Sequence, residues 1–139
     1  MTGLESVFVD SNILIYLIDE ASSSNKKEKV ENLLSPAFII STQVVSENVN
    51  VCLKKLKLGK EKAFKHARGL LTRFKVVTIH QDILLKSFDL AEKYQYGLWD
   101  CIILATAIFY NCTIVYSEDM QDGQVIEGTL TIKNPFKEV

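Results

Sequence analysis

Two aspartates follow short apolar runs of the kind that form buried strands. Asp10 comes directly after residues 7–9, and Asp119 comes three residues after the run that ends at Tyr116. The carboxyl ends of strands in an open parallel sheet border one ligand-binding crevice, so both carboxylates are expected there. Taken singly, each aspartate also fits a turn or a helix cap, and Asp122, followed by Gly123, is interpreted as a turn residue.

Two further acids belong to predicted helices. Glu47 comes three residues after Val44 and four before Val51, which places its carboxylate on a helix ridge at the rim of the core. A fully exposed glutamate is the alternative. Asp100 opens an almost entirely apolar helix that runs to Tyr110.

The sequence around Asp100 indicates a need for a cation. A carboxylate in the first turn of a helix gains only about 0.3 to 1 kcal/mol from the helix dipole, whereas burying one without a partner costs several kcal/mol. No basic residue lies between Lys93 and Lys133. The partner is therefore a distant Lys or Arg, or a metal ion.

Converging carboxylates repel one another, which raises their pKa values and favours a bound divalent cation. The predicted ligands are Asp10, Glu47, Asp100 and Asp119. Neither His66 nor His80 has a ligand-like spacing with these acids, and oxygen-only ligation selects hard ions, Mg²⁺ first and Mn²⁺ second. Such an ion on a phosphate activates water and stabilises the charge that develops during displacement. The predicted chemistry is phosphodiester hydrolysis.

The basic residues are concentrated in one segment. Nine of the sixteen lie in residues 54–75, against the single acid Glu61. This segment is either a solvated helix face or a surface that contacts phosphates, since clustered cations gain affinity by releasing the counterions of a nucleic acid. Lys54, Lys55 and Lys57 follow Glu47 on the same predicted helix, so they begin close to the proposed metal site and are predicted to contact the phosphates of a nucleic acid.

Predicted strands alternate with predicted helices along the chain. Strands are expected at 7–9, 37–40, 75–79, 113–116 and 130–132, and helices at 13–18, 25–34, 42–58, 60–74, 81–96 and 99–110. Gly97 is expected to end the helix before it. The alternation predicts an α/β fold with three layers, α/β/α, around a mainly parallel sheet.

Size and composition fit one domain over residues 1–139, with 47% hydrophobic and 24% charged residues and a net charge of −1. No stretch reaches the roughly 20 apolar residues of a membrane helix, and the first six residues do not resemble a secretory signal. We therefore expect a cytoplasmic protein without a membrane partner. Cys52, Cys101 and Cys112 lie among apolar neighbours and are expected to be buried thiols.

Four segments of the chain resemble the PIN domains, and among them the small VapC-type toxins of prokaryotic toxin–antitoxin pairs. The matching segments are Val7-Phe-Val-Asp10-Ser-Asn12, Ser41-Thr-Gln-Val44-Val-Ser-Glu47, Asp100-Cys-Ile-Ile-Leu-Ala-Thr-Ala107 and Ser117-Glu-Asp119. They occur in the family's order across nearly the whole chain. Glu118 and Asp122 lie close to the fourth acid, which is assigned to Asp119 by its spacing from Ser117.

The resemblance implies a PIN-like fold and an endoribonuclease that uses Mg²⁺ or Mn²⁺, the toxin of a toxin–antitoxin pair. It implies that Asn12 or Ser117 orients the carboxylates. An RNA substrate, a homodimer, and an antitoxin whose tail blocks the acidic groove are also implied.

Two other functions compete with cleavage. A PIN-like module could bind RNA or a protein partner without cutting, and the presence of all four acids argues against it. A phosphorylation receiver domain would also place aspartates at strand ends. It would need an acidic pair near the start and a Lys after a late strand, and the sequence has neither.

Overall fold

A computed structural model describes residues 6–21 and 24–137. Its central element in this part of the chain is a six-stranded sheet in the order β3-β2-β1-β4-β6-β5. The strands are β1 (Val7–Val9), β2 (Ile39–Ser41), β3 (Lys75–Val77), β4 (Ile114–Tyr116), β5 (Val125–Ile126) and β6 (Leu130–Lys133). Neighbouring strands are parallel except β5 and β6, which pair antiparallel. The prediction of a mainly parallel sheet is confirmed.

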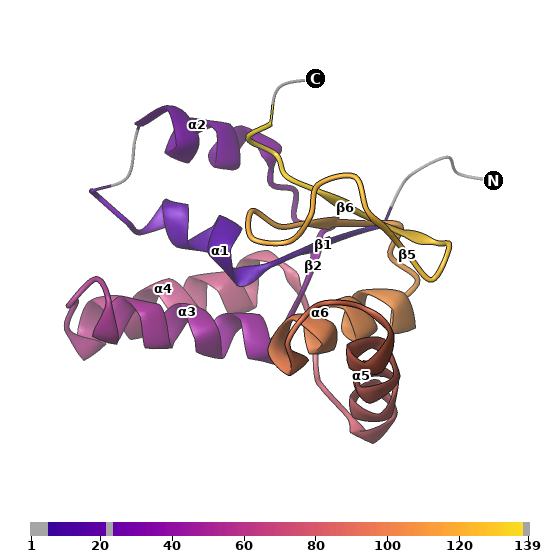
Figure 1. The fold of residues 1–139 in the computed structure, drawn as a ribbon. Coiled ribbons are helices and arrows are strands. Elements are labelled where there is room, and N and C mark those ends of the chain that lie inside the picture. Colours follow the sequence, from indigo (N-terminus) through magenta and orange to yellow (C-terminus); the bar gives the residue numbers. More distant parts are fainter. Residues whose placement is uncertain (1–5, 22–23, 138–139) are drawn as a thin grey trace.

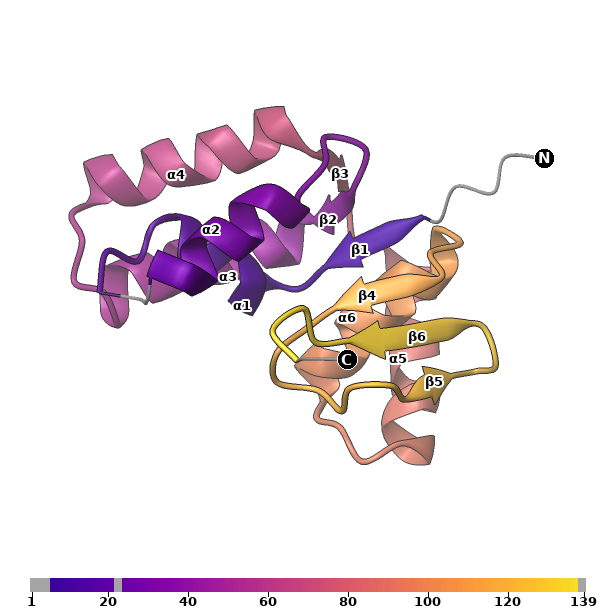
Figure 2. The ribbon, with the colours of Figure 1, turned by 90° about the horizontal axis from the view of Figure 1, so that it is seen from above.

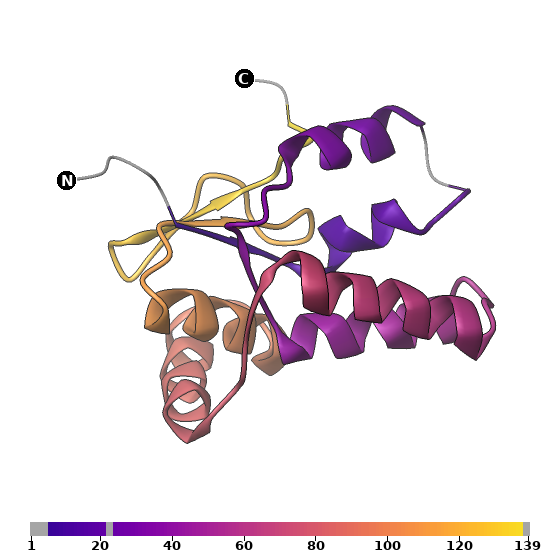
Figure 3. The same cartoon turned by 180° about the vertical axis from the view of Figure 1, so that it is seen from behind.

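Helices flank this sheet on both sides. They are α1 (Ser11–Leu14), the 3-10 helix η1 (Ile15–Leu17), α2 (Ser24–Leu33), α3 (Thr42–Lys54), α4 (Lys60–Arg73), α5 (Gln81–Lys93) and α6 (Leu98–Phe109). In Figure 1, α5 and α6 lie below the sheet and α2 lies above it. Seen from behind in Figure 3, α3 and α4 run side by side. The predicted three-layer α/β/α arrangement is confirmed.

Burial of most of α6 in the core leaves only its ends able to carry a charged side chain. This helix packs against α5, β4 and β6, and every residue from Cys101 to Ala107 is buried. Asp100 is the one charged residue of α6 and occupies its first turn, at the end where the helix emerges from the core. The fold therefore places this carboxylate at the border between core and surface.

The order of the strands creates one edge suited to a ligand. β1 lies between β2 and β4, so the chain order reverses at β1, and open sheets bind ligands beyond the strand ends at such a reversal. Figure 2 shows β1, β4 and β6 pointing the same way. Asp10, Thr42 and Ser117 directly follow β1, β2 and β4 at this edge.

Several boundaries differ from the predictions. α3 ends at Lys54 rather than at residue 58, and α5 ends at Lys93 rather than at 96. Gly97 is the N-cap of α6, not the end of α5, and α1 begins at Ser11 with Asp10 as its N-cap, before the predicted start at residue 13. β5 was not predicted.

The expected cytoplasmic location rests partly on the first six residues, of which 1–5 lie outside the described residues. In the part of the chain that is described, no helix is both long enough and apolar enough to cross a membrane.

Candidate active site

Asp10 lies at the carboxyl end of β1 and is only 4% exposed. Its Oδ1 accepts the backbone N–H of Ser11 at 2.7 Å. Its Oδ2 accepts the hydroxyl of Ser117 at 2.9 Å and, more weakly, the side-chain amide of Asn12 at 3.4 Å. Each of these donors is neutral. The contacts therefore hold the carboxylate in place without compensating its charge.

Burial raises the pKa of Asp10 from its ordinary value of 3.8 to about 7, although hydrogen bonds from Ser117 and Ser11 act to lower it. The negative charges of Glu47 and Asp100 raise this pKa further. Glu47 belongs to α3 and Asp100 to α6, so three separate elements bring carboxylates into electrostatic range of one another. A nearby cation would favour the ionised form of Asp10.

Glu47 is half-buried on α3, as predicted for the rim of the core. The helix begins after its N-cap Ser41, whose hydroxyl oxygen accepts the backbone N–H of Val44 at 3.2 Å. Nε2 of Gln43 donates to Oε2 of Glu47 at 3.3 Å and to the backbone oxygen of Trp99 at 3.2 Å. Gln43 thereby links Glu47 to Trp99 in the first turn of α6, and Asp100 directly follows Trp99.

Asp100 is half-buried, and its pKa is raised by burial and then by the negative charge of Asp119. Asp119 therefore lies within electrostatic range of Asp100, which itself lies within range of Asp10. Within residues 6–21 and 24–137, however, no three acidic, His or Cys side chains lie close enough together to form a ready-made metal site. The fold brings the four predicted acids to one region without gathering their oxygens as ligands.

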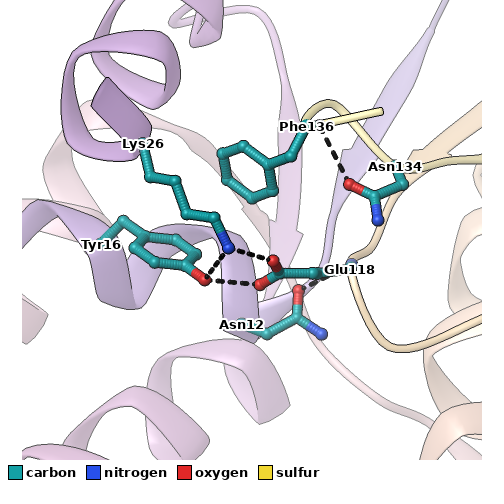
Figure 4. A network of polar contacts seen from close by, with 6 residues as sticks. All are labelled: Asn12, Tyr16, Lys26, Glu118, Asn134 and Phe136. Atoms are coloured by element: carbon teal, nitrogen blue, oxygen red, sulfur yellow. Dashed lines mark hydrogen bonds and ion pairs between the residues drawn. The ribbon is translucent and has the colours of Figure 1, made fainter. Parts of the chain in front are cut away.

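The three acids after β4 differ in their surroundings. Asp119 is exposed and borders a cavity of 330 Å³. Oε2 of Glu118 forms an ion pair with Lys26 at 2.7 Å, and its Oε1 accepts the hydroxyl of Tyr16 at 2.6 Å (Figure 4). Oδ1 of Asp122 accepts the backbone N–H of Asn134, the residue after β6, at 2.7 Å. Two of the three acids are engaged by other groups, which favours Asp119 as the acid available to a ligand.

The network around Glu118 ties α2 to the loop after β4. Burial acts to raise the pKa of Glu118, but hydrogen bonds from Lys26 and Tyr16 outweigh it and lower that pKa. The ammonium of Lys26 also lies 4.8 Å from the ring centre of Phe136 (Figure 4). Sequence reasoning missed this network because Lys26 and Glu118 are 92 residues apart and share no local spacing.

Asn12 and Ser117 occupy the positions expected of groups that orient Asp10. Besides its contact with Asp10, Asn12 accepts the backbone N–H of Glu118 at 3.2 Å, which links α1 to the loop after β4. Ser117 is fully buried, and its oxygen accepts the backbone N–H of Met120 at 3.4 Å. Both side chains are fixed by a second contact of their own.

The nine basic residues of segment 54–75 are all exposed. Of the three lysines predicted to contact RNA, Lys55 borders the 330 Å³ cavity, which Asn12, Tyr16 and Asp119 also line. Lys54 ends α3 and is exposed, and Lys57 is exposed in the turn that follows. Lys55 is therefore the best placed of the three to meet a phosphate beside Asp119.

Besides the network around Glu118, sequence reasoning missed the contacts of Gln43. Its distance of four residues from Glu47 on a predicted helix was the available signal, because such pairs face one another. The thiol prediction is confirmed, since Cys52, Cys101 and Cys112 are buried and free. His66 contacts the side-chain oxygen of buried Asn48 at 2.9 Å, and the side-chain nitrogen of Asn48 donates to the backbone oxygen of Ser11 at 3.2 Å.

The arrangement suits chemistry on a phosphate. Its donors are carboxylate, amide and hydroxyl oxygens, which suit hard divalent cations rather than zinc or copper. A cavity with Asp119 on its wall and Lys55 at its border gives a phosphate access to both a carboxylate and a positive charge.

Comparison with known proteins agrees with this geometry. The family model for the PIN domain matches residues 7–121. A chain of a toxin–antitoxin complex from Klebsiella pneumoniae is 29% identical with a TM-score of 0.70, over 96% of this chain and 100% of that one.

Two further solved structures share the fold. VapC20 from Mycobacterium tuberculosis, described as a sarcin-ricin loop cleaving toxin, is 17% identical with a TM-score of 0.69, over 82% of this chain and 90% of that one. DNA-bound VapBC from Salmonella typhimurium is 17% identical with a TM-score of 0.70, over 95% and 99% of the two chains. No match was found among curated protein sequences.

Proposed function

This chain belongs to the PIN domain family, and we propose that it is a metal-dependent endoribonuclease, the toxin of a toxin–antitoxin pair. The observation that carries the proposal is the buried carboxylate of Asp10, whose pKa is raised to about 7 by burial, with the charges of Glu47 and Asp100 adding to the effect. A divalent cation would relieve both the burial cost and the repulsion. The oxygen donors fit Mg²⁺ first and Mn²⁺ second.

In this proposal the ion is held by Asp10, Glu47, Asp100 and Asp119. When bound, it would lower the pKa of a water molecule and stabilise negative charge on the phosphate. Ser117 and Asn12 hold Asp10 in one orientation through the contacts at 2.9 and 3.4 Å. Lys55 positions a flanking phosphate from the border of the cavity.

The solved neighbours support the biological part of the proposal. The chain from Klebsiella pneumoniae comes from a toxin–antitoxin complex, and the VapC20 structure is described as a sarcin-ricin loop cleaving toxin. We therefore propose an RNA substrate and an antitoxin partner for this chain, acting in the cytoplasm. A homodimer and a single domain over residues 1–139 remain part of the proposal.

Cleavage of a pooled RNA with Mg²⁺, with Mn²⁺ and with chelator tests the function. The expected result is fragments with either ion and intact RNA with chelator, and intact RNA with an Asp10→Asn variant in all three conditions. RNA that binds and stays intact with both ions would instead assign the chain to the non-cleaving alternative.

A further inference from the structure

A second cavity lies between the first turns of α3 and the start of α6, which adjoin one another in Figures 1 and 3. Its volume is 550 Å³, within the range of about 300 to 1,000 Å³ typical of small-ligand sites. Gln43, Ser46, Glu47, Asn50 and Trp99 form most of its wall. One proposed metal ligand, Glu47, therefore belongs to this cavity as well, which we call the α3–α6 trough.

Trp99 is the aromatic wall of the trough. It is the only tryptophan of the chain, and it is 67% exposed on a helix whose residues from Cys101 to Ala107 are all buried. Small-ligand sites are lined mainly by apolar and aromatic side chains, with a few polar groups that orient the ligand. A flat indole ring is a stacking surface for unpaired nucleic acid bases.

The opposite wall of the trough is polar. Gln43, Ser46 and Asn50 follow one another at three- and four-residue steps on α3, so they share one face of that helix. Ser46 and Asn50 are exposed, and a hydroxyl and an amide can each donate to and accept from the edge of a base. The two walls together offer stacking and hydrogen bonding, the two contacts by which proteins recognise unpaired bases.

Gln43 couples the trough to the proposed metal site. Its amide nitrogen bonds both to Oε2 of Glu47, at 3.3 Å, and to the backbone oxygen of Trp99, at 3.2 Å. Its Oε1 is buried and has no hydrogen-bond partner among the described residues. A buried acceptor without a donor is costly, so Gln43 gains if its side chain moves to reach a donor, such as the amino group of a base in the trough.

We propose that the α3–α6 trough binds one base of the RNA, that of a nucleotide adjoining the cleaved bond. Trp99 stacks on the base, and Ser46 and Asn50 contact its edge. Because Glu47 lines the trough and Asp100 follows Trp99, a base held there has its phosphate beside the proposed metal site. This inference rests on the proposed ribonuclease function and assigns the preference for particular bases to the trough.

Fluorescence tests the proposal directly, since all tryptophan emission comes from Trp99. Hexaribonucleotides of each base, titrated in chelator and low salt, are expected to quench this emission. A hexamer with the same sugar–phosphate chain but no bases is expected to leave it unchanged. Equal quenching by both hexamers would overturn the stacking contact.

Matched variants measure the contribution of the ring. Trp99→Leu is expected to bind a labelled hexamer roughly 5- to 150-fold more weakly by fluorescence anisotropy, which corresponds to the usual strength of one base–aromatic stack. Trp99→Phe should retain most of the affinity. Phe109→Leu, at the other end of α6 and 48% exposed, is the control and should bind as the unmodified chain does. Asn50→Ala should change the order of affinity for the four bases.

A second copy of the chain is the competing occupant, because Leu85 and Phe88 on α5 and Leu98 on α6 are also exposed. A Trp99→Leu variant that changes from dimer to monomer in sedimentation, with unchanged hexamer affinity, would overturn the proposal in favour of a protein contact. If the pooled RNA is cut at the same sites by Trp99→Leu, the function stands and the trough proposal fails. If base-dependent quenching occurs without cleavage, the trough proposal stands and the function fails.

Discussion

The hydroxyl of Ser117 donates to Oδ2 of Asp10 at 2.9 Å, although the two residues are 107 positions apart. They follow β4 and β1, which are neighbouring parallel strands. The backbone N–H of Asp10 also donates to the backbone oxygen of Tyr116 at 2.9 Å. The register of these two strands, rather than a loop, therefore fixes the orientation of the buried carboxylate.

Replacing this hydroxyl should weaken the proposed metal site. In Ser117→Ala, Asp10 loses a hydrogen bond that lowers its pKa, so its charged form becomes less stable. Loss of such an orienting partner typically costs about 10- to 100-fold in metal affinity or activity. Calorimetric titration with Mn²⁺ measures the affinity, and Ser117→Thr, which keeps the hydroxyl, should recover it. A Thr variant as weak as the Ala variant would refute the role of the hydroxyl.

Asp10 should make the metal-free protein less stable as the pH rises. Its pKa is about 7 when folded against an ordinary 3.8, so its full stabilising contribution is present below about pH 4 and is lost as the pH rises to about 7. At about 1.4 kcal/mol for each intervening pH unit, the loss is about 4 kcal/mol. Urea unfolding in chelator from pH 4 to 8 measures it.

Asp10→Asn should remove most of that pH dependence, because an amide does not ionise. Asp89→Asn, a change to an exposed residue of α5, is the matched control and should leave the dependence intact. Adding Mg²⁺ at pH 7.5 should stabilise the unmodified protein and not Asp10→Asn. An identical pH profile for both variants would show that another group causes the loss.

Asp100→Asn should remove cleavage, a loss of roughly 100-fold or more, while leaving the fold intact. Burial and the charge of Asp119 both raise the pKa of Asp100, which means that they destabilise its charged form. A neutral side chain of the same shape removes this destabilisation. The free energy of unfolding without metal should therefore be unchanged or higher. Full activity in this variant would exclude Asp100 as a ligand.

Among the acids after β4, Asp119→Asn should cost far more activity than Glu118→Gln or Asp122→Asn. Glu118→Gln should instead cost about 1 kcal/mol of stability, because it weakens the contacts with Lys26 and Tyr16, which are partly solvent-exposed. Cleavage rates and thermal unfolding of the three variants separate the two effects. If Asp122→Asn is the most damaging, the fourth ligand has been assigned three residues too early.

The elements that position the acids were largely predictable from local patterns. The apolar run before Asp10, the helix start at residue 42 and the apolar helix behind Asp100 each depend on neighbouring residues, and the structure contains all three. The proximity of Asp10 and Asp119 was predicted through the general rule for parallel sheets. Glu47 was added by its helix spacing, and Asp100 by its need for a cation. The contacts of Gln43 depend on how α3 meets α6, which no local pattern specifies.

The missed boundaries have tertiary or backbone causes. α3 ends early because the chain turns back at Lys57, whose φ of 58° is rare for a residue other than glycine. α5 stops before Tyr94, whose hydroxyl contacts Glu127 after β5, a contact that local sequence cannot reveal. β5 has two residues, too few to show an alternating pattern.

The basic residues provide the last prediction. Replacing Lys54, Lys55 and Lys57 by Gln should weaken RNA binding and flatten its salt dependence, while metal affinity and the sequence preference of cleavage stay nearly unchanged. Lysines that contact phosphates position a strand without reading its bases. Each lost contact with a single strand should reduce the slope of log affinity against log salt by about 0.7.

The positions of the three lysines indicate which of them matters most for RNA binding. Lys55 borders the cavity that Asp119 lines, so Lys55→Gln alone should account for most of the change in slope. A triple change of Lys60, Lys62 and Lys65 on α4 removes the same charge elsewhere in the basic segment and is the matched control. If both triple variants lower the slope equally, the charge acts through the general field of the surface rather than through contacts beside the acids. If neither does, this segment is a solvated helix face, and RNA must approach the acids from another side.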